Sequence, residues 1–397
     1  MGLNETPRAN RLHIGIFGKR NVGKSALINA LTGQETALVA PVAGTTTDPV
    51  YKAMEIHPLG PCVLIDTAGF DDEGVVGKLR VERTREAARN TEIALIVFDG
   101  ASEISLEKHW IAEFKLNGVP TIAVLNKADL LPNPCAISTV IEEHTGLKPI
   151  IVSSRTKEGI EKVLAALVRH LPADHDVPTL TGGLVEDGDL VLLVMPQDLQ
   201  APKGRLILPQ VQTIRELLDR KCLVVSVTID RLEDALRTLA RPPAVIITDS
   251  QVFQAVYEKK PPESKLTSFS VLFAGYKGDL AYFVPSVTTI DRLTETSKVL
   301  IAEACAHVPL TEDIGREKIP RLLRQKVGEK LAVEHVRGMD FPADLSSYDL
   351  IIHCGACMFN RKYVLSRVEQ AKRQGVPMTN YGIVLAYFAG ILDQISL

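Results

Sequence analysis

Short apolar runs alternate with amphipathic stretches along the first 171 residues of the chain. Each apolar run ends in a cluster of glycine, aspartate, asparagine or serine, and a segment with helical spacing of its apolar residues follows. Parallel sheets produce this alternation, because a helix returns the chain from each buried strand to the next. We therefore predict an α/β domain over residues 12–172, with helices on both faces of a parallel sheet. The predicted strands are HIGIFG, CVLIDTAG, ALIVFDG, TIAVLNKAD and PIIVSS.

A polar break over residues 173–183 predicts a linker, because it is rich in turn-forming residues and has no apolar period. Beyond it, strand patterns at LVLLVMP, CLVVSVTI, AVIITD and SFSVLF alternate with helical patterns near Val211–Asp219 and Leu232–Leu239. We expect a second, smaller α/β domain over residues 184–290.

The third region, residues 291–397, has a pattern that also favours a smaller α/β domain. It predicts a helix from about Thr296 to Ala306, a basic helix within Arg316–Lys330, a strand at YDLIIH and a helix from about Lys362 to Gln374. The chain is thus predicted to hold one large α/β domain followed by two smaller ones.

Composition and charge exclude several classes of protein. The 397 residues are 46% hydrophobic and 23% charged, and 45 basic against 48 acidic residues leave a net charge of −3. A general polyanion binder would show a basic excess, so we expect no nucleic-acid partner. No apolar run approaches the roughly 20 residues that span a bilayer, and six cysteines are too few for a disulfide scaffold. We expect a cytoplasmic protein without a membrane partner.

Residues Gly18 to Ser25 have the spacing GxxxxGKS between the strand HIGIF and the helix ALINAL. Glycines in such a loop let successive backbone N–H groups face phosphate oxygens, and the helix N-terminus adds partial positive charge. Lys24 is expected to contact the β- and γ-phosphates, and the Ser25 hydroxyl is expected to bind Mg²⁺. The loop therefore predicts a nucleoside triphosphate site.

Further motifs identify the base as guanine. Asp66 and Gly69, in DTAG, end a strand where a carboxylate could hold Mg²⁺ through water and an N–H could meet the γ-phosphate. Asp129, in NKAD, can accept hydrogen bonds from guanine N1–H and N2–H₂, which adenine does not offer. Ser153 and Ser154 end the next strand and can present backbone N–H groups to guanine O6. The predicted ligands are therefore GTP or GDP with Mg²⁺.

The motifs together define the predicted nucleotide site. Lys24, Thr46 and Gly69 are the predicted catalytic residues, and Ser25 and Thr46 are predicted to bind Mg²⁺. The predicted nucleotide contacts are Gly18, Asn21, Val22, Gly23, Lys24, Ser25, Ala26, Asp66, Gly69, Asn126, Lys127, Asp129, Ser153 and Ser154.

These motifs, in this order over about residues 12–171, resemble the small GTPase domains of the TrmE/Era type. Phe70 follows DTAG, where Ras-like proteins carry the glutamine that orients water, so a different group must position the nucleophile. Asn21 stands at the P-loop position whose side chain helps bind K⁺ in potassium-activated relatives. The resemblance thus implies slow hydrolysis that K⁺ accelerates more than Na⁺, with the cation acting like an arginine finger.

A separate cluster of cysteine and histidine lies near the end of the chain. Cys305 and His307 precede a second group formed by His353, Cys354 and Cys357. A Cys-x-x-Cys turn brings two sulfurs onto one metal or cluster. Tetrahedral Zn²⁺ would take the three cysteines and either histidine, whereas a [4Fe–4S] cluster would take the three thiolates. Thiolate softness suits both, so the residues leave this choice open.

CxH followed at a distance by HCxxC, downstream of a potassium-type GTPase domain, resembles the HydF family of [FeFe]-hydrogenase maturation GTPases over the whole chain. The resemblance implies a homodimer formed by the middle domain and a [4Fe–4S] cluster in the C-terminal domain. It implies a scaffold and carrier for the diiron precursor of the hydrogenase active site. The implied partners are the radical-SAM maturases HydE and HydG and the apo-hydrogenase.

By this resemblance Cys305, Cys354 and Cys357 would ligate the cluster. His307 and His353 would be labile fourth ligands or supporting groups, and Glu312 is a further candidate for the fourth position.

Two other functions are consistent with parts of the pattern. A ribosome- or tRNA-directed GTPase would use the C-terminal cysteines for structural zinc, and a structural dimer would use GTP only as a folding ligand.

Overall fold

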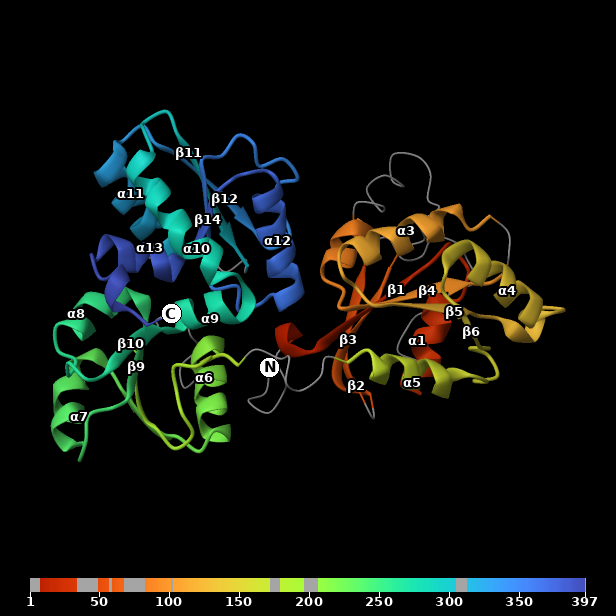
Figure 1. Ribbon diagram of the computed structural model, residues 1–397, viewed down its shortest axis with the longest axis horizontal. Coiled ribbons are helices and arrows are strands. Elements are labelled where there is room, and N and C mark those ends of the chain that lie inside the picture. Colours follow the sequence, from red (N-terminus) through yellow and green to blue (C-terminus); the bar gives the residue numbers. More distant parts are fainter. Residues whose placement is uncertain are drawn as a thin grey trace. The chain divides into compact units, whose positions relative to one another are not determined.

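The computed structural model describes residues 8–33, 49–56, 59–67, 83–100, 103–171, 179–195, 206–304 and 313–396. The chain divides into two compact units, Met1–Asp176 and Val177–Leu397 (Figure 1). Among the described residues no helix combines the length and the apolar character that crossing a bilayer requires.

Unit 1 is built on a six-stranded sheet of order β2-β3-β1-β4-β5-β6. All neighbouring strands pair in parallel except β2 with β3, which pair antiparallel. The predicted parallel α/β fold is confirmed, while the antiparallel edge strand β2 was not expected. The strands are β1 Leu12–Phe17, β2 Val50–Ile56, β3 Gly60–Asp66, β4 Ile93–Phe98, β5 Thr121–Leu125 and β6 Ile150–Ile151.

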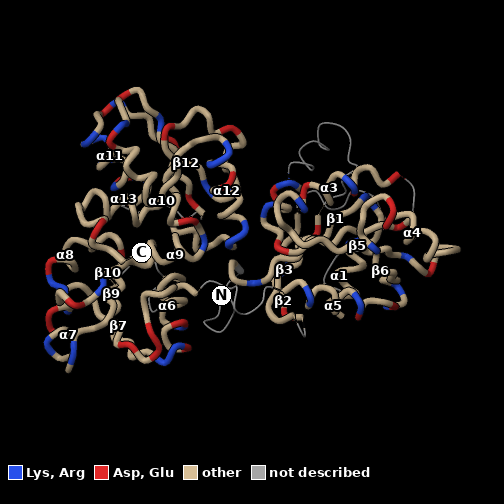
Figure 2. The backbone as a smooth tube through the Cα atoms, in the orientation of Figure 1, with Lys and Arg blue, Asp and Glu red and all other residues tan. Residues whose placement is uncertain are grey.

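Helices cover both faces of this sheet because the strands are apolar on both sides. Successive residues of β4 alternate between two hydrophobic clusters: Leu95 packs with α1 (Lys24–Thr32) and α5 (Ile160–Arg169), and Ile96 packs with α3 (Ser105–Leu116) and α4 (Pro134–Thr145). The central strands carry no charged residues: β1, β4 and β5 contain no Lys, Arg, Asp or Glu (Figure 2).

Unit 2 contains two four-stranded sheets of order β10-β9-β7-β8 and β12-β11-β13-β14, each parallel throughout. One hydrophobic core runs through both, from Leu192 in the first sheet to Ile301 in the second. The strands are β7 Leu190–Val194, β8 Leu223–Val227, β9 Val245–Thr248, β10 Lys265–Ser268, β11 Lys298–Glu303, β12 Ala332–Arg337, β13 Leu350–His353 and β14 Met378–Asn380. The helices are α6 Leu208–Asp219, α7 Leu232–Thr238, α8 Phe253–Tyr257, α9 Phe269–Lys277, α10 Leu280–Ser286, α11 Ile319–Val327, α12 Arg361–Arg373 and α13 Tyr381–Phe388.

Two predicted elements in unit 2 were wrong. The segment from Thr296 to Ala306, predicted as a helix, contains strand β11, and the predicted strand SFSVLF is mostly helix α9, which starts at Phe269 after a short strand. Short apolar runs do not distinguish a buried strand from a buried helix by periodicity. The Ser268 side chain accepts a hydrogen bond from the Val271 N–H and so caps α9.

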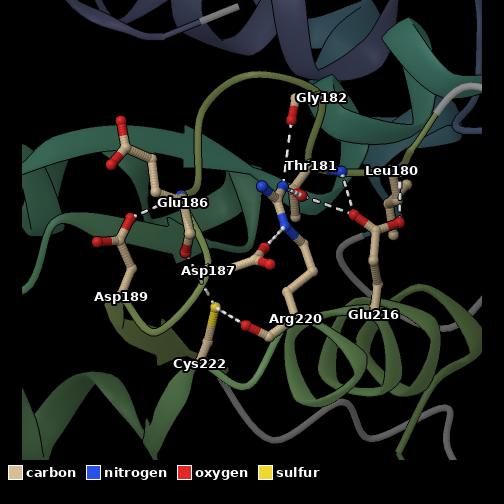
Figure 3. A network of polar contacts seen from close by, with 9 residues as sticks. All are labelled: Leu180, Thr181, Gly182, Glu186, Asp187, Asp189, Glu216, Arg220 and Cys222. Atoms are coloured by element: carbon tan, nitrogen blue, oxygen red, sulfur yellow. Dashed lines mark hydrogen bonds and ion pairs between the residues drawn. The ribbon is translucent and has the colours of Figure 1, made fainter.

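The first described segment of unit 2 is tied to helix α6 by side chains (Figure 3). The Glu216 carboxylate accepts hydrogen bonds from the N–H groups of Leu180 and Thr181 at 2.5 and 2.7 Å. Arg220 donates to the Thr181 hydroxyl at 3.1 Å and pairs with Asp187 at 3.1 Å. Helix α6 in turn packs against α9, so this attachment is continuous with the interior of the unit.

Candidate functional site

The loop between β1 and α1 has the conformation of a phosphate cradle. Gly18, Asn21 and Gly23 have positive φ values of 150°, 60° and 92°. A Cβ on Gly18 would lie 2.5 Å from the Val97 carbonyl oxygen, and one on Gly23 would lie 2.3 Å from Asn126 Nδ2. Within the described residues no side chain caps the first turn of α1, where the helix N-terminus favours an anion. The loop is therefore shaped for phosphate and requires both glycines.

Lys24, predicted to be catalytic, lies at this loop together with Ser25 and Asp66, which were predicted to bind magnesium and the nucleotide. Lys24 Nζ donates to the carbonyl oxygens of Gly18 and Lys19 at 3.0 and 2.8 Å, so its ammonium lies across the cradle. Ser25 Oγ donates to Asp66 Oδ2 at 2.7 Å. Asp66 is only 5% exposed, and burial raises the pKa of its carboxyl against the opposing effects of Ser25 and Lys24. A partly buried hydroxyl–carboxylate pair of this kind fits Mg²⁺.

The guanine-specificity loops are braced against the phosphate loop through Asn126. Its Nδ2 donates to the Val22 carbonyl at 3.0 Å, and its Oδ1 accepts from the Ser154 N–H and hydroxyl at 3.1 and 2.8 Å. Ser153 Oγ donates to Asp129 Oδ1 at 2.7 Å, which orients a carboxylate that is itself exposed.

Of the remaining predicted site residues, some lie in the described part of the chain and some do not. Lys127 adopts a positive φ of 59° and pairs with Asp99 at 2.9 Å, and Ala26 lies in the first turn of α1. Thr46 and Gly69 lie outside the described residues. The structure thus brings together those residues predicted to bind phosphate, magnesium and guanine that it describes.

The cysteine turn follows strand β13 in unit 2. Cys354 Sγ accepts hydrogen bonds from the N–H groups of Ala304 and Ala356 at 3.1 and 3.4 Å. Ala356 has a φ of 52°, which tightens the turn before Cys357. Burial raises the pKa of Cys354 to about 11 and also raises that of Cys357, although nearby Lys277 opposes the second shift.

Backbone donors aimed at a buried sulfur stabilise a thiolate, and a bound metal or cluster keeps such a thiol deprotonated. The turn therefore fits thiolate ligation. Cys305, His307 and Glu312 lie outside the described residues, and among the residues that are described no three His, Cys, Asp or Glu side chains gather as a metal site.

His353 is buried beside the turn with both ring nitrogens engaged. Its Nδ1 lies 2.8 Å from the Cys354 carbonyl oxygen, and its Nε2 lies 2.9 Å from Arg367 Nη1. Burial, reinforced by Arg367, lowers the pKa of His353 to about 3, so the ring is neutral. Because Arg367 donates to Nε2, Nδ1 carries the proton and donates to the carbonyl. In this conformation His353 supports the turn and offers no free lone pair to a metal.

Two buried cations at the cysteine turn were missed by sequence analysis. Lys277 closes helix α9 and is 1% exposed, and Arg367 lies on α12 and is 2% exposed. A lysine ending an otherwise apolar segment was the only signal for the first. Arg367 carried none, because basic residues are frequent in that helix.

The two units match different families of known proteins, and unit 1 matches GTPases. The family model described as 50S ribosome-binding GTPase matches residues 13–127. The tRNA modification GTPase MnmE of Chromobacterium violaceum is 35% identical over 158 residues, which are 40% of this chain and 34% of that protein. MnmE of Ralstonia nicotianae is 36% identical over 168 residues, with the same shares. The chain thus spans about a third of the length of these curated relatives.

Among solved structures, an Era variant of Aquifex aeolicus bound to GDP·AlF₄⁻ aligns at 20% identity with a TM-score of 0.37, covering 57% of this chain and 98% of that chain. Similarity at this level carries no further argument.

The second unit matches different families. The model described as hydrogen maturase F dimerization domain matches residues 180–278, and the one described as hydrogen maturase F tetramerization domain matches residues 281–396. Together they account for more than half of the chain, and a P-loop GTPase domain precedes them. The chain therefore belongs to the hydrogen maturase F family of GTPases.

Proposed function

We propose that this protein is a scaffold and carrier that assembles the diiron subsite of [FeFe]-hydrogenase and delivers it to the apo-enzyme. The observation that carries the proposal is the pairing, in a chain of this family, of a guanine-nucleotide site with a half-buried Cys354–Cys357 turn in which two backbone N–H groups donate to the Cys354 sulfur. HydE and HydG would supply the diiron unit, and apo-hydrogenase would accept it. In this scheme residues 184–290 dimerise and residues 291–397 hold the cluster.

The GTPase domain performs hydrolysis through charge and position rather than covalent chemistry. We assign Lys24 to the β- and γ-phosphates, because its ammonium already lies over the loop carbonyls. Ser25 and Asp66 would hold Mg²⁺, which offsets phosphate charge, and Thr46 and Gly69 would close on the γ-phosphate. Asp129, oriented by Ser153, selects guanine.

The cluster site would use Cys305, Cys354 and Cys357 as thiolate ligands for a [4Fe–4S] cluster. Such a cluster, when bound, supplies one iron whose fourth ligand is exchangeable, which suits a protein that holds and releases a second metal unit. His307, Glu312 or an exchangeable ligand would occupy that position. Because both nitrogens of His353 are engaged, we assign it to support of the turn.

Anaerobic reconstitution of the full chain with iron and sulfide, followed by incubation with apo-hydrogenase, tests this function. The expected results are a brown protein with the broad visible absorption of an iron–sulfur cluster and, after loading in the presence of HydE and HydG, an active hydrogenase. A colourless protein that contains stoichiometric zinc when purified without air would contradict the proposal and favour a structural metal site.

We also propose that K⁺ activates GTP hydrolysis through Asn21. The residue is exposed at the P-loop and its φ of 60° turns the backbone at the phosphate cradle. Hydrolysis is expected to be on the order of tenfold faster in K⁺ than in Na⁺, below the roughly 10³–10⁵-fold effect of an arginine finger. Asn21→Gly tolerates the same φ and removes the side chain, so it is expected to abolish the difference.

Phosphate release measured in matched KCl and NaCl checks this prediction. Asn117→Gly, at an exposed position after helix α3, serves as the control and is expected to keep the preference for K⁺. Equal rates of the wild-type protein in both salts would refute potassium activation.

Association of two copies is proposed to use the edge of the first sheet in unit 2. Among the described strands β8 is at the end of that sheet, and Leu223 on it is 60% exposed. Leu218 and Leu206 are 56% and 46% exposed. All three leucines lie in the region that matches the dimerization model, Leu223 on the edge strand, Leu218 on helix α6 and Leu206 just before it. An edge strand with an exposed leucine pairs readily with a second copy.

Leu223→Asp is expected to convert the assembly into smaller species, weakening association by about 2 kcal/mol or more, because it places a charge in an apolar interface. Sedimentation velocity over a concentration series measures the change. Leu116→Asp, at an 82% exposed position of unit 1, is the control and is expected to leave the mass unchanged. A Leu223→Asp protein with wild-type mass would place the interface elsewhere.

A further inference from the structure

The ammonium of Lys277 is buried directly behind the cysteine turn. Lys277 Nζ donates to the carbonyl oxygens of Ala356 and Cys357, each at 3.2 Å, and of Phe359 at 2.6 Å. An ammonium group has three donors, so all of them are used on one short segment of chain. The lysine therefore fixes the path of the backbone that carries Cys354 and Cys357.

A charge in this position needs an anionic counterpart. Lys277 is 1% exposed, and among the described residues no carboxylate forms an ion pair with its nitrogen. The Phe273 ring, with its centroid 5.5 Å from Nζ, adds only a weak cation–π attraction. Burying an ammonium against neutral carbonyls alone is unfavourable. The thiols of Cys354 and Cys357 are the groups beside it that become anionic when they ligate a metal.

We propose that Lys277 is a positioning residue of the cluster site, holding the Cys354–Cys357 turn in ligating conformation and placing a positive charge against the thiolate-bound cluster. This inference rests on the proposed function, since it requires the turn to ligate a cluster. The lysine touches backbone and not iron, so it acts through the cysteines.

The second buried cation, Arg367, contacts the same segment through other residues. Arg367 Nη1 lies 2.9 Å from His353 Nε2, and its guanidinium carbon lies 4.6 Å from the centre of the Phe359 ring and 4.7 Å from that of Phe341. Lys277 and Arg367 thus belong to different helices and both bear on the segment from His353 to Phe359. Two buried cations around one thiol pair match the negative charge of a thiolate-ligated cluster.

The lysine comes from a part of the chain that matches a different family model from the cysteines. Helix α9 ends within the region matched by the dimerization model, and the turn lies in the region matched by the tetramerization model. Further contacts join α9 to strand β14 and helix α12 of the same matched region: Ser270 Oγ donates to Asn380 Oδ1 at 3.0 Å, and Arg361 Nε donates to the Tyr276 carbonyl at 2.9 Å. The cluster site is therefore completed by α9.

The test compares four full-length proteins after anaerobic reconstitution: wild type, Lys277→Met, Lys277→Arg and Lys260→Met. Lys260 is the matched control, because its Nζ also donates to three backbone carbonyls, at 3.2, 3.4 and 2.9 Å, within the loop before β10. The measurements are the rate of iron transfer to a chelator and the midpoint potential of the cluster by EPR-monitored titration.

Lys277→Met is expected to release iron about 10- to 100-fold faster, the range typical for loss of a group that orients metal ligands. Its midpoint potential is expected to shift to a more negative value, because an electron is added without the nearby positive charge. Lys277→Arg is expected to restore the potential in part, and Lys260→Met is expected to match the wild type in both measurements.

A Lys277→Met protein with wild-type iron release and potential would overturn the inference. If circular dichroism shows that this variant does not fold, Lys277→Gln is tested by the same two measurements. Glutamine keeps a polar donor and removes the charge. A wild-type protein that takes up no cluster would instead refute the proposed function itself, so the two failures are distinguishable.

Discussion

Asp129→Asn is expected to exchange the nucleotide specificity of the protein from GTP to xanthosine triphosphate. The Asp129 carboxylate is exposed at the nucleotide site and is oriented by Ser153 Oγ at 2.7 Å. A carboxylate accepts hydrogen bonds from both N1–H and N2–H₂ of guanine. The NH₂ group of an amide is itself a donor and would face the donor N2 amino group without forming a hydrogen bond. Xanthine carries a carbonyl at that position and accepts the amide donor. GTP affinity should fall by about 10⁴-fold, the penalty for leaving paired polar groups unmatched.

Competition titrations of GTP and xanthosine triphosphate against one labelled guanine nucleotide measure this exchange. Glu143→Gln, at an exposed position of helix α4, makes the same change in net charge and is expected to leave both affinities unaltered. Retention of full GTP affinity by Asp129→Asn would show that another group reads the base.

Cys354→Ser and Cys357→Ser are each expected to abolish the cluster while GTP binding persists. Serine preserves the size of the side chain but replaces a soft thiolate with a hydroxyl that does not hold iron–sulfur clusters. The structure supports Cys354 as a ligand more directly than Cys357, because the Cys354 sulfur accepts hydrogen bonds from the N–H groups of Ala304 and Ala356. Iron and sulfide content after reconstitution should fall to a small fraction of the wild-type value, and hydrogenase activation should be lost with it.

Cys222→Ser is the matched control for these variants. Cys222 is a buried thiol of unit 2, and its sulfur lies 3.5 Å from the Glu186 carbonyl oxygen and 3.8 Å from that of Arg220 (Figure 3). It is expected to keep the full cluster content. If loss of Cys222 removed the cluster as completely as loss of Cys354, the effect would reflect general destabilisation rather than ligation.

The sheet and phosphate loop of unit 1 were predictable because their signals are local. The glycines at 18 and 23 occur where the backbone needs positive φ or has no room for a Cβ, and both requirements appear directly as residue types. The strands are buried on both faces, so each appears as a continuous apolar run. Strand β2 escaped prediction because it is an edge strand of mixed polarity in which only Ile56 is buried.

In unit 2 the same reasoning failed where an apolar run is too short to show its period. The run in β11 is six residues long and fully apolar only in its middle, and the segment in α9 is apolar on nearly every position. Tertiary burial decided between strand and helix in both places. The first segment became a strand and the second a serine-capped helix because of their places in the sheets. A local sequence pattern does not specify those places.

The surroundings of the cysteine turn depend on contacts between residues far apart in the chain. The spacing of Cys354 and Cys357 indicated a ligand pair, but nothing near them pointed to Lys277, which is 80 positions away from Cys357. His353 was predicted either to ligate or to support, and only the hydrogen bonds of its two nitrogens distinguish these roles. The ligand residues were therefore predictable and the groups that hold them were not.

The position of Lys277 also limits how this chain can be recombined with its relatives. The two family models meet between residues 278 and 281, immediately after the lysine. A chimera joined at that seam would combine the cysteine turn of one parent with helix α9 of the other, and would separate two parts that fit each other. Crossover at the boundary between the units, after Asp176, avoids this mismatch and keeps Leu180 and Thr181 with Glu216, so the exchangeable module is the whole of unit 2.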